Sequence, residues 1–300
     1  MIELHPTQYG IAARLVRGCE EELSIAATLG GWNPGQVLVD SVTSPHAAVI
    51  RATETTAIAG DASYTPAYED IRRTLRFMES VVADTPDWEA VMGKIHPNPY
   101  LRRYLRRQYL ARSLTYRDYR EHLAPGFYLE RLTPAHLEGF ENSDTVRHWA
   151  ETWGLAHFFA DGGGYIIRDG STICAWSLTD CRVRDRAAIG IVVDARYRRR
   201  GLAGIVSAAN ADRWFHEGIA TLEWLCVAAN AGSQATARKL GFTLAREYAA
   251  YTTFPPYEND TDQTPEEWRT WDAFYRSVGA YREHPAEYGC VEARIARILS

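Results

Sequence analysis

The sequence predicts a mixed α/β fold, in which helices flank a sheet of strands and a helical tail follows. Strand-like runs outnumber helical ones as far as "IGIVVD" (189–194), and strands and helices alternate after it. Aromatic residues then recur every three or four positions near the end of the chain. The 300 residues are 46% hydrophobic and 24% charged, as is usual for a soluble globular protein.

Strand patterns come before helical patterns in the first part of the chain. Short β-branched runs separated by turn residues predict strands between residues 36 and 64. Residues 68–83 carry apolar side chains at helical spacing, which predicts a helix. The stretch 101–120 predicts an amphipathic helix with arginines on one face. Leucines and tyrosines on its other face favour packing over nucleic-acid binding.

A proline-glycine pair in "HLAPGF" (122–127) indicates a domain boundary. We therefore predict an N-terminal domain over residues 1–124, a second domain over 125–254, and a linker with a helical tail over 255–300. The aromatic residues of the tail share one helical face, which predicts packing onto the body of the protein. A lid over a substrate is the alternative for this tail.

Charge and cysteine content narrow the class of protein. The net charge of −5 disfavours a nucleic-acid binder and suits a cationic or amine-bearing partner. Five dispersed cysteines predict reduced, buried thiols and a cytoplasmic location. The first residues lack the pattern of a signal peptide, and no apolar run reaches the ~20 residues of a membrane span. The nine histidines form no metal-binding motif, so we expect no metal.

The stretch "VVDARYRRRGLAG" (192–204) combines a strand end, an arginine run and a small-residue turn. A helix is predicted over 202–218, and the unpaired amides and positive dipole at its N-terminus attract an anion. Gly201 lets the backbone approach a phosphate closely, and the arginines add charged donors. Neither the Gly-Lys-Ser/Thr ending of a P-loop nor a GxGxxG fingerprint is present. These features predict a pyrophosphate-binding turn.

Two blocks resemble the signature of the GNAT superfamily of N-acetyltransferases. The first is Arg198-x-x-Gly201-x-Ala203, and the second is "NAGSQATARKLGF" (230–242). The resemblance implies a mostly antiparallel GNAT sheet over 125–254 and a divergent, GNAT-like N-terminal half without a coenzyme A motif. The layout resembles the GNAT group that contains the zwittermicin A self-resistance acetyltransferase.

The resemblance implies acetyl-CoA as the acyl donor and a primary amine as the acceptor, joined by direct attack in a ternary complex. It places the pantetheine arm beside the "IGIVV" strand, where a backbone amide would polarise the thioester carbonyl. Asn230 and Ser233 would contact the arm or the nucleotide, although both could cap a helix. The cofactor-binding residues implied are Ile191, Val192, Val193, Arg198, Arg199, Arg200, Gly201, Leu202, Ala203, Gly204, Asn230 and Ser233.

The usual catalytic side chains of that family are missing. The positions that often bear a glutamate base and a tyrosine acid are Ala187 and Ala237. Three carboxylates on or near the central strands could accept a proton, and two tyrosines of the last strand could donate one. The alternative for each carboxylate is a place on the surface, and the alternative for each tyrosine is packing in the core or at the surface. These candidates are Asp180, Asp185, Glu223, Tyr248 and Tyr251.

Several aromatic residues fall where GNAT proteins often build the acceptor wall, with core packing as the alternative. These residues are Trp149, Trp153, Phe158 and Phe159. We expect an N-acetyltransferase acting on a small-molecule amine, such as an amino-bearing antibiotic, with no nucleic acid or membrane partner. The chain would be a monomer or a homodimer. A catalytically silent acyl-CoA sensor and an interaction protein are the alternatives.

Overall fold

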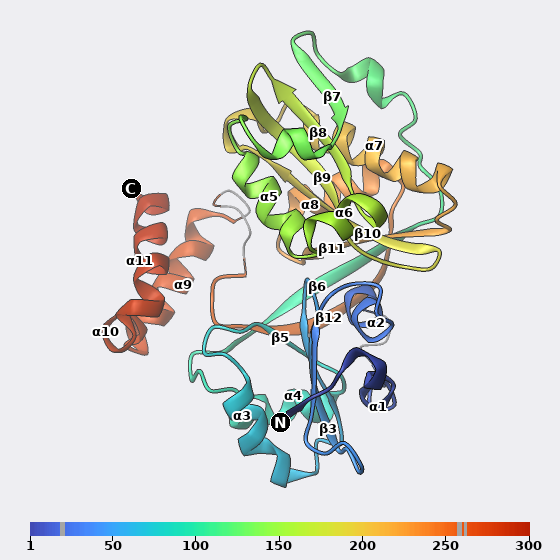
Figure 1. Cartoon of the computed structure of the whole chain (residues 1–300). Helices are drawn as coiled ribbons and strands as arrows, with labels where there is room; N and C mark the ends of the chain where they lie inside the picture. The colour runs from blue at the N-terminus through green and yellow to red at the C-terminus, as the bar shows by residue number, and fades with distance from the viewer. Residues whose placement is uncertain (19–21, 257–259, 261–262) are drawn as a thin grey trace.

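The computed structural model describes residues 1–18, 22–256, 260 and 263–300, and it confirms the predicted mixed α/β fold. Two lobes lie on either side of two long strands that run between them (Figure 1). The strands are β1 (Ile2–Glu3), β2 (Gln36–Val39), β3 (Ala47–Arg51), β4 (Thr56–Gly60), β5 (Val81–Ala83), β6 (Arg102–Ala111), β7 (Phe127–Arg131), β8 (Gly164–Asp169), β9 (Thr172–Val183), β10 (Arg186–Val193), β11 (Thr221–Val227) and β12 (Thr243–Thr252).

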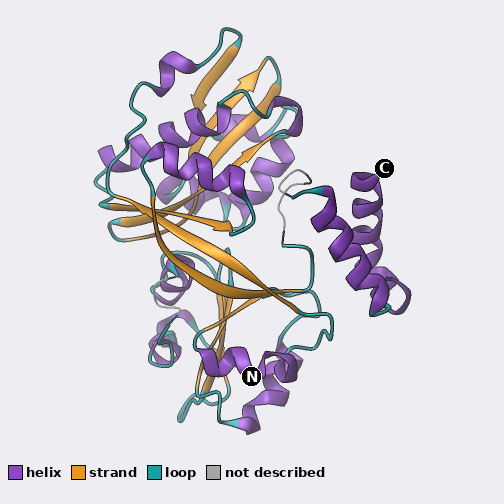
Figure 2. Ribbon diagram, turned by 180° about the vertical axis from the view of Figure 1, so that it is seen from behind, coloured by secondary structure: helices purple, strands orange, loops and turns teal. Residues whose placement is uncertain are grey.

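Helices lie against both lobes, and those near the C-terminus form a separate group at one side (Figure 2). They are α1 (Gly10–Ala13), α2 (Leu23–Leu29), α3 (Tyr68–Thr74), α4 (Pro86–Ile95), α5 (Ser143–Glu151), α6 (Leu155–Asp161), α7 (Leu202–His216), α8 (Ala231–Leu240), α9 (Pro265–Ser277), α10 (Ala280–Glu283) and α11 (Pro285–Leu299). We call β1–β5 with α1–α4 the N-terminal lobe, and β7–β11 with α5–α8 the C-terminal lobe.

The strands of the described residues form one sheet of 12, in the order β1-β2-β3-β4-β5-β12-β6-β11-β10-β9-β8-β7. Two pairs are parallel, β4 with β5 and β10 with β11, and the other pairs are antiparallel. The sheet is therefore mostly antiparallel, as predicted. Each parallel pair is joined through a helix, as a parallel connection requires.

The elements occur in the same order in the two halves of the chain. Each half runs through one strand, two helices, three strands, a helix, a strand, a helix and a last strand. The two last strands, β6 and β12, pair with each other over most of their length. In addition, β6 pairs with β11 of the C-terminal lobe, and β12 bridges to β5 of the N-terminal lobe. Each lobe thus lies next to the last strand of the other half.

The prediction of a helix over 101–120 is wrong, because Arg102–Ala111 forms β6. Its sequence fits both periods, since leucines and tyrosines recur at helical spacing while Gln108 and Tyr109 face opposite sides of the sheet. Both side chains are buried. The segment forms a strand because it hydrogen-bonds to β11 on one edge and to β12 on the other. A local sequence pattern cannot reveal partners that are distant in the chain.

Two further expectations need correction. The helix predicted over 68–83 ends at Thr74, and β5 follows because its residues pair in parallel with β4. Cys290 is exposed, whereas three other cysteines are buried as predicted: Cys174, Cys181 and Cys226. The fifth, Cys19, and part of the predicted linker lie outside the described residues.

The helical tail packs around its own aromatic core. Trp268, Tyr275 and Tyr288 are fully buried in one cluster, together with Tyr100 from the segment before β6. The Arg102 guanidinium lies over two aromatic rings of α9, and Asn98 donates to the Tyr288 hydroxyl at 3.1 Å. The tail is therefore attached to the N-terminal half by specific contacts. Within the described part of the chain, no helix is long and apolar enough to cross a membrane.

Candidate functional site

The turn between β10 and α7 contains two residues in the left-handed conformation. The helix begins at Leu202, as predicted, after Gly201 with φ of +79°. Arg199 also adopts a left-handed conformation, with φ of +64°. A Cβ atom on Gly201 would meet no atom within 4 Å, so the space next to this residue is open. The amides of the first turn, including those of Ala203 and Gly204, have no acceptor within the helix.

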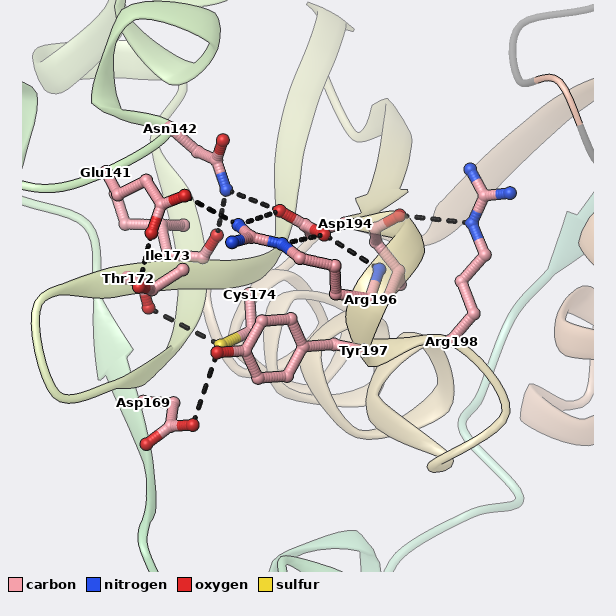
Figure 3. A network of polar contacts seen from close by, with 11 residues as sticks. Glu141, Asn142, Asp169, Thr172, Ile173, Cys174, Asp194, Arg196, Tyr197 and Arg198 are labelled. Atoms are coloured by element: carbon pink, nitrogen blue, oxygen red, sulfur yellow. Dashed lines mark hydrogen bonds and ion pairs between the residues drawn. The ribbon is translucent and has the colours of Figure 1, made fainter.

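A polar network fixes the start of this turn (Figure 3). The Asp194 carboxylate accepts from the backbone amide of Arg196 at 2.9 Å, from its guanidinium at 2.7 Å, and from Asn142 Nδ2 at 2.9 Å. The Arg196 guanidinium also contacts Glu141 at 2.8 Å. These hydrogen bonds, above all those from Arg196, hold the pKa of Asp194 far below its usual range. Asn142 and Glu141 lie more than 50 residues from Asp194 and Arg196, so the local sequence does not reveal this network.

The three arginines of the run, Arg198 to Arg200, differ in their contacts and exposure. Arg198 Nε donates to the carbonyl of Val193 at 3.3 Å, which ties the run to the end of β10. Arg199 and Arg200 are exposed, and the Arg200 guanidinium lies 5.4 Å from the centre of the Tyr197 ring. Lys239 adds a cation nearby, since its Nζ would lie 3.9 Å from a Cβ on Gly204. The arginine run and Lys239 therefore bring several cations close to the first turn of α7 in sequence or in space.

The strand that leads to this turn separates from its parallel neighbour. Within the described residues, β10 pairs with β11 only from Arg186 to Ala188, although β10 continues to Val193. On its other edge it remains paired with β9 to the end. Ile191, Val192 and Val193 are partly exposed. The outer backbone edge of this segment can therefore hydrogen-bond to an extended ligand.

A β-bulge lies opposite the point of separation. Ala188 pairs with Cys181 and Ile189 pairs with Thr179, so Asp180 is the extra residue of β9. Asp180 is 6% exposed, and its carboxylate lies over Gly190: a Cβ on that glycine would be 2.5 Å from Asp180 Oδ1. The Asp180 carbonyl accepts from Trp153 Nε1 at 3.1 Å and from Thr53 Oγ1 at 3.3 Å. The bulge is thus held by both lobes.

Glu223 of β11 lies at the same point and is fully buried. It forms an ion pair with Arg186 and accepts from Gln108 Nε2 at 2.6 Å. Burial raises the pKa of Glu223, although Arg186 and Gln108 oppose this. Glu223 therefore lies where the sequence analysis expected a carboxylate, but as part of a buried network.

The other three catalytic candidates lie on other parts of the sheet or its turns. Tyr251 of β12 is largely buried, and its hydroxyl donates to Glu89 at 3.2 Å. Asp185 is exposed in the turn before β10, and its carbonyl accepts from the amide of Ala220 at 2.7 Å. Tyr248 lies on β12 opposite Arg106 of β6. Burial raises the pKa of Tyr248 well above its usual value. The structure thus does not bring Asp185, Glu223 and Tyr248 together as one group.

The remaining predicted residues have structural partners. Asn230 caps α8 by accepting from the amide of Ser233 at 2.8 Å, and the Ser233 hydroxyl accepts from Trp224 Nε1 at 2.8 Å. Trp153 and Phe158 are buried in the core beneath α5 and α6, and the partly exposed Trp149 packs against the same cluster.

The two alanines that replace the usual catalytic residues, Ala187 and Ala237, are fully buried between the sheet and its helices. Both positions therefore serve the core of the C-terminal lobe. In the part of the chain that the structure describes, no cluster of three or more potential metal ligands occurs.

Comparison with solved structures shows the same fold in several acetyltransferases. A GCN5-related N-acetyltransferase-like protein from Streptococcus suis has 19% sequence identity and a TM-score of 0.66, covering 82% of this chain and 98% of that one. A GCN5-related N-acetyltransferase from Kribbella flavida has 14% identity and a TM-score of 0.53, covering 78% and 95%. A tandem GNAT protein from the clavulanic acid biosynthesis pathway has 12% identity and a TM-score of 0.53, covering 85% and 98%.

Sequence comparison assigns the family. No curated protein matches the chain. The model of the GNAT acetyltransferase family matches residues 13–251, which include the strands of both lobes from β2 to β11. This match covers well over half of the sequence. The chain belongs to the GNAT acetyltransferase family.

Proposed function

We propose that the protein is an acetyl-CoA-dependent N-acetyltransferase that acetylates a primary amine of a small molecule. The observation that carries this proposal is the turn at the N-terminus of α7. There, Arg199 and Gly201 adopt left-handed conformations, the space beside Gly201 is open, and Lys239 Nζ would lie 3.9 Å from a Cβ on Gly204. Such a site favours a diphosphate through its amides, its helix dipole and its cations.

The open edge of β10 supports the same assignment. Acetyl-CoA would supply the acetyl group and its thiol leaving group, and Ile191 to Val193 would hold its extended arm through backbone hydrogen bonds. An amide at Ile191 or Val192 would stabilise negative charge on the thioester oxygen, because it is fixed in place before the reaction. Asn230 and Ser233 keep their capping contacts in this arrangement.

We also propose that the N-terminal half, residues 1–124, is a divergent copy of the same unit and binds no coenzyme A. The repeated order of elements supports this. The stretch 61–70, which follows β4 as the arginine run follows β10, contains no lysine or arginine. Asp61 accepts from the amide and hydroxyl of Ser63 there, and Glu69 and Asp70 stand in the first turn of α3. Their negative charge repels a phosphate.

The finer assignments stay predictions: an amino-bearing antibiotic as acceptor, the zwittermicin A group, a cytoplasmic location, and a monomer or homodimer. The net charge of −5 suits a cationic acceptor. The enzyme is tested by measuring acetyl-CoA binding by calorimetry and thiol release with a panel of primary amines. Acceptor-dependent release supports the proposal. Binding without release from any amine would favour an acyl-CoA sensor, and no binding would leave an interaction protein.

A further inference from the structure

The proposed reaction needs a group that removes a proton from the acceptor, since alkylamines are mostly protonated near neutral pH. Strand β10 carries no carboxylate along Ala187–Val193. Its neighbour β9 brings one to the same place, because the bulge turns Asp180 over Gly190. The carboxylate thus occupies the space that a side chain of β10 at position 190 would fill.

We propose that Asp180 is the catalytic base that accepts this proton; the inference rests on the proposed function. The backbone amides of Ile191 and Val192, which we expect to polarise the thioester carbonyl, lie one and two residues after Gly190. This separation is about 3–7 Å along the strand. An amine bound at the carboxylate would therefore lie within reach of the carbonyl carbon. Gly190 is partly exposed, and the Asp180 side chain is almost fully buried.

The acceptor ammonium transfers one proton to the Asp180 carboxylate, and the neutral amine nitrogen attacks the thioester carbonyl carbon. A carbon–nitrogen bond forms, the carbon–sulfur bond breaks, and the electron pair of that bond leaves with sulfur. The second proton of the nitrogen passes to the thiolate, which gives an N-acetyl amide and free thiol. Asp180 then releases its proton to solvent.

Two features of the structure fit this role. The bulge is fixed, because the Asp180 carbonyl accepts from Trp153 and from Thr53 of the N-terminal lobe. Gly190 leaves room that even alanine would remove. Other carboxylates lie near Asp180, since burial first, and then four carboxylates, raise the pKa of the Cys181 thiol well above its usual value. Those carboxylates are Asp180, Glu223, Glu54 and Glu22.

Three carboxylates near Asp180 each lie beside an arginine. These groups come from β6, β10, β11, β12, the β3–β4 turn and the N-cap of α2. The pairs are Glu223 with Arg186, Glu54 with Arg106 at 3.7 Å, and Glu22 with Arg246 at 3.8 Å. The variants below leave these three pairs unchanged. A change in the pH dependence of kcat therefore reports on Asp180.

The test compares Asp180→Asn with Asp144→Asn, a matched change at an exposed position of α5. The probes are acetyl-CoA and the best amine of the panel. We expect Asp180→Asn to lower kcat by about 10²–10⁴ at pH 7, with acetyl-CoA affinity and Tm unchanged. The loss should shrink toward pH 10, where the amine is neutral without a base. Asp144→Asn should match the wild type throughout.

A second variant tests the geometry. Gly190→Ala should lower kcat at least tenfold by displacing the carboxylate, and should add no further loss in the Asp180→Asn background. Normal kcat in Asp180→Asn, or a loss that persists equally at pH 10, would overturn the inference while leaving the transferase intact. Loss of acetyl-CoA binding in Asp180→Asn would make the role structural. Binding without turnover of any amine would overturn the inference together with the proposed reaction.

Discussion

Gln108 Nε2 donates to Glu223 Oε2 at 2.6 Å, which joins β6 from the first half of the chain to β11 of the C-terminal lobe. The Gln108 side-chain oxygen accepts from Arg246 Nε of β12 at 2.7 Å. One buried amide therefore links three neighbouring strands. Because it satisfies a buried carboxylate and a guanidinium at once, the point where β10 separates from β11 depends on residues of both halves.

The raised pKa of Glu223 predicts a pH dependence of stability. The folded state holds this proton more tightly than the unfolded state, so the carboxyl loses stabilising effect as the pH rises above about 4.5, its ordinary pKa. The free energy of unfolding of the wild type, relative to Glu223→Gln, should fall between pH 4.5 and 7. Urea denaturation at four pH values checks this; a relative stability that rises over that window would contradict the assignment.

The lowered pKa of Glu79 predicts a pH dependence of stability in the opposite direction. Burial opposes ionisation there, but hydrogen bonds from Arg51, the Arg76 amide and Thr56 lower the pKa of Glu79. Its stabilising effect is therefore complete above pH 4.5 and is lost as the pH falls below it. Relative to Glu79→Gln, the wild type should lose stability on acidification, in the same denaturation series.

Gly201→Val should reduce acetyl-CoA affinity at least tenfold. A β-branched residue at φ of +79° strains the turn by about 1–3 kcal/mol and points a side chain into the open space beside it. Calorimetric titration measures the affinity. The matched control is Gly218→Val, at the other end of α7, where φ is +90° and the surrounding space is equally open. Equal affinities of the two variants would count against the turn as the cofactor site.

The shared strands predict that neither half folds alone. A fragment of residues 1–124 lacks β12, and a fragment of 125–300 lacks β6, so each exposes an unpaired strand edge. We expect each fragment to lack a cooperative thermal transition, and an equimolar mixture to regain one. Calorimetry distinguishes the cases. Two fragments that each unfold cooperatively would show that the boundary at 124 separates independent domains.

We expect the helical tail to stabilise the folded protein and to take no part in catalysis. Trp268→Ala removes a fully buried ring of α9, and it should lower the free energy of unfolding by about 3–5 kcal/mol. Turnover per folded molecule should be unchanged, as measured well below the transition temperature. A fall in kcat without a fall in stability would instead support a lid.

Features that are local in the chain could be predicted from the sequence. The start of α7 at Leu202 follows from neighbouring residues, and the structure agrees with it, whereas phosphate binding at Gly201 stays a prediction. The strand β6 and the Asp180 bulge could not be predicted in this way, because each depends on partners far away in sequence. Arg196 shows both cases, since Asp194 is two residues away while its other partner, Glu141, lies 55 residues earlier in the chain.

The central claim is that the backbone amides opening α7 hold the diphosphate of acetyl-CoA. A crystal structure of the complex tests it most directly. We predict phosphate oxygens within hydrogen-bonding distance of the amides of Leu202, Ala203 and Gly204, with the extended arm along Ile191–Val193. A diphosphate bound elsewhere, or a complex that does not form at millimolar acetyl-CoA, would contradict the claim.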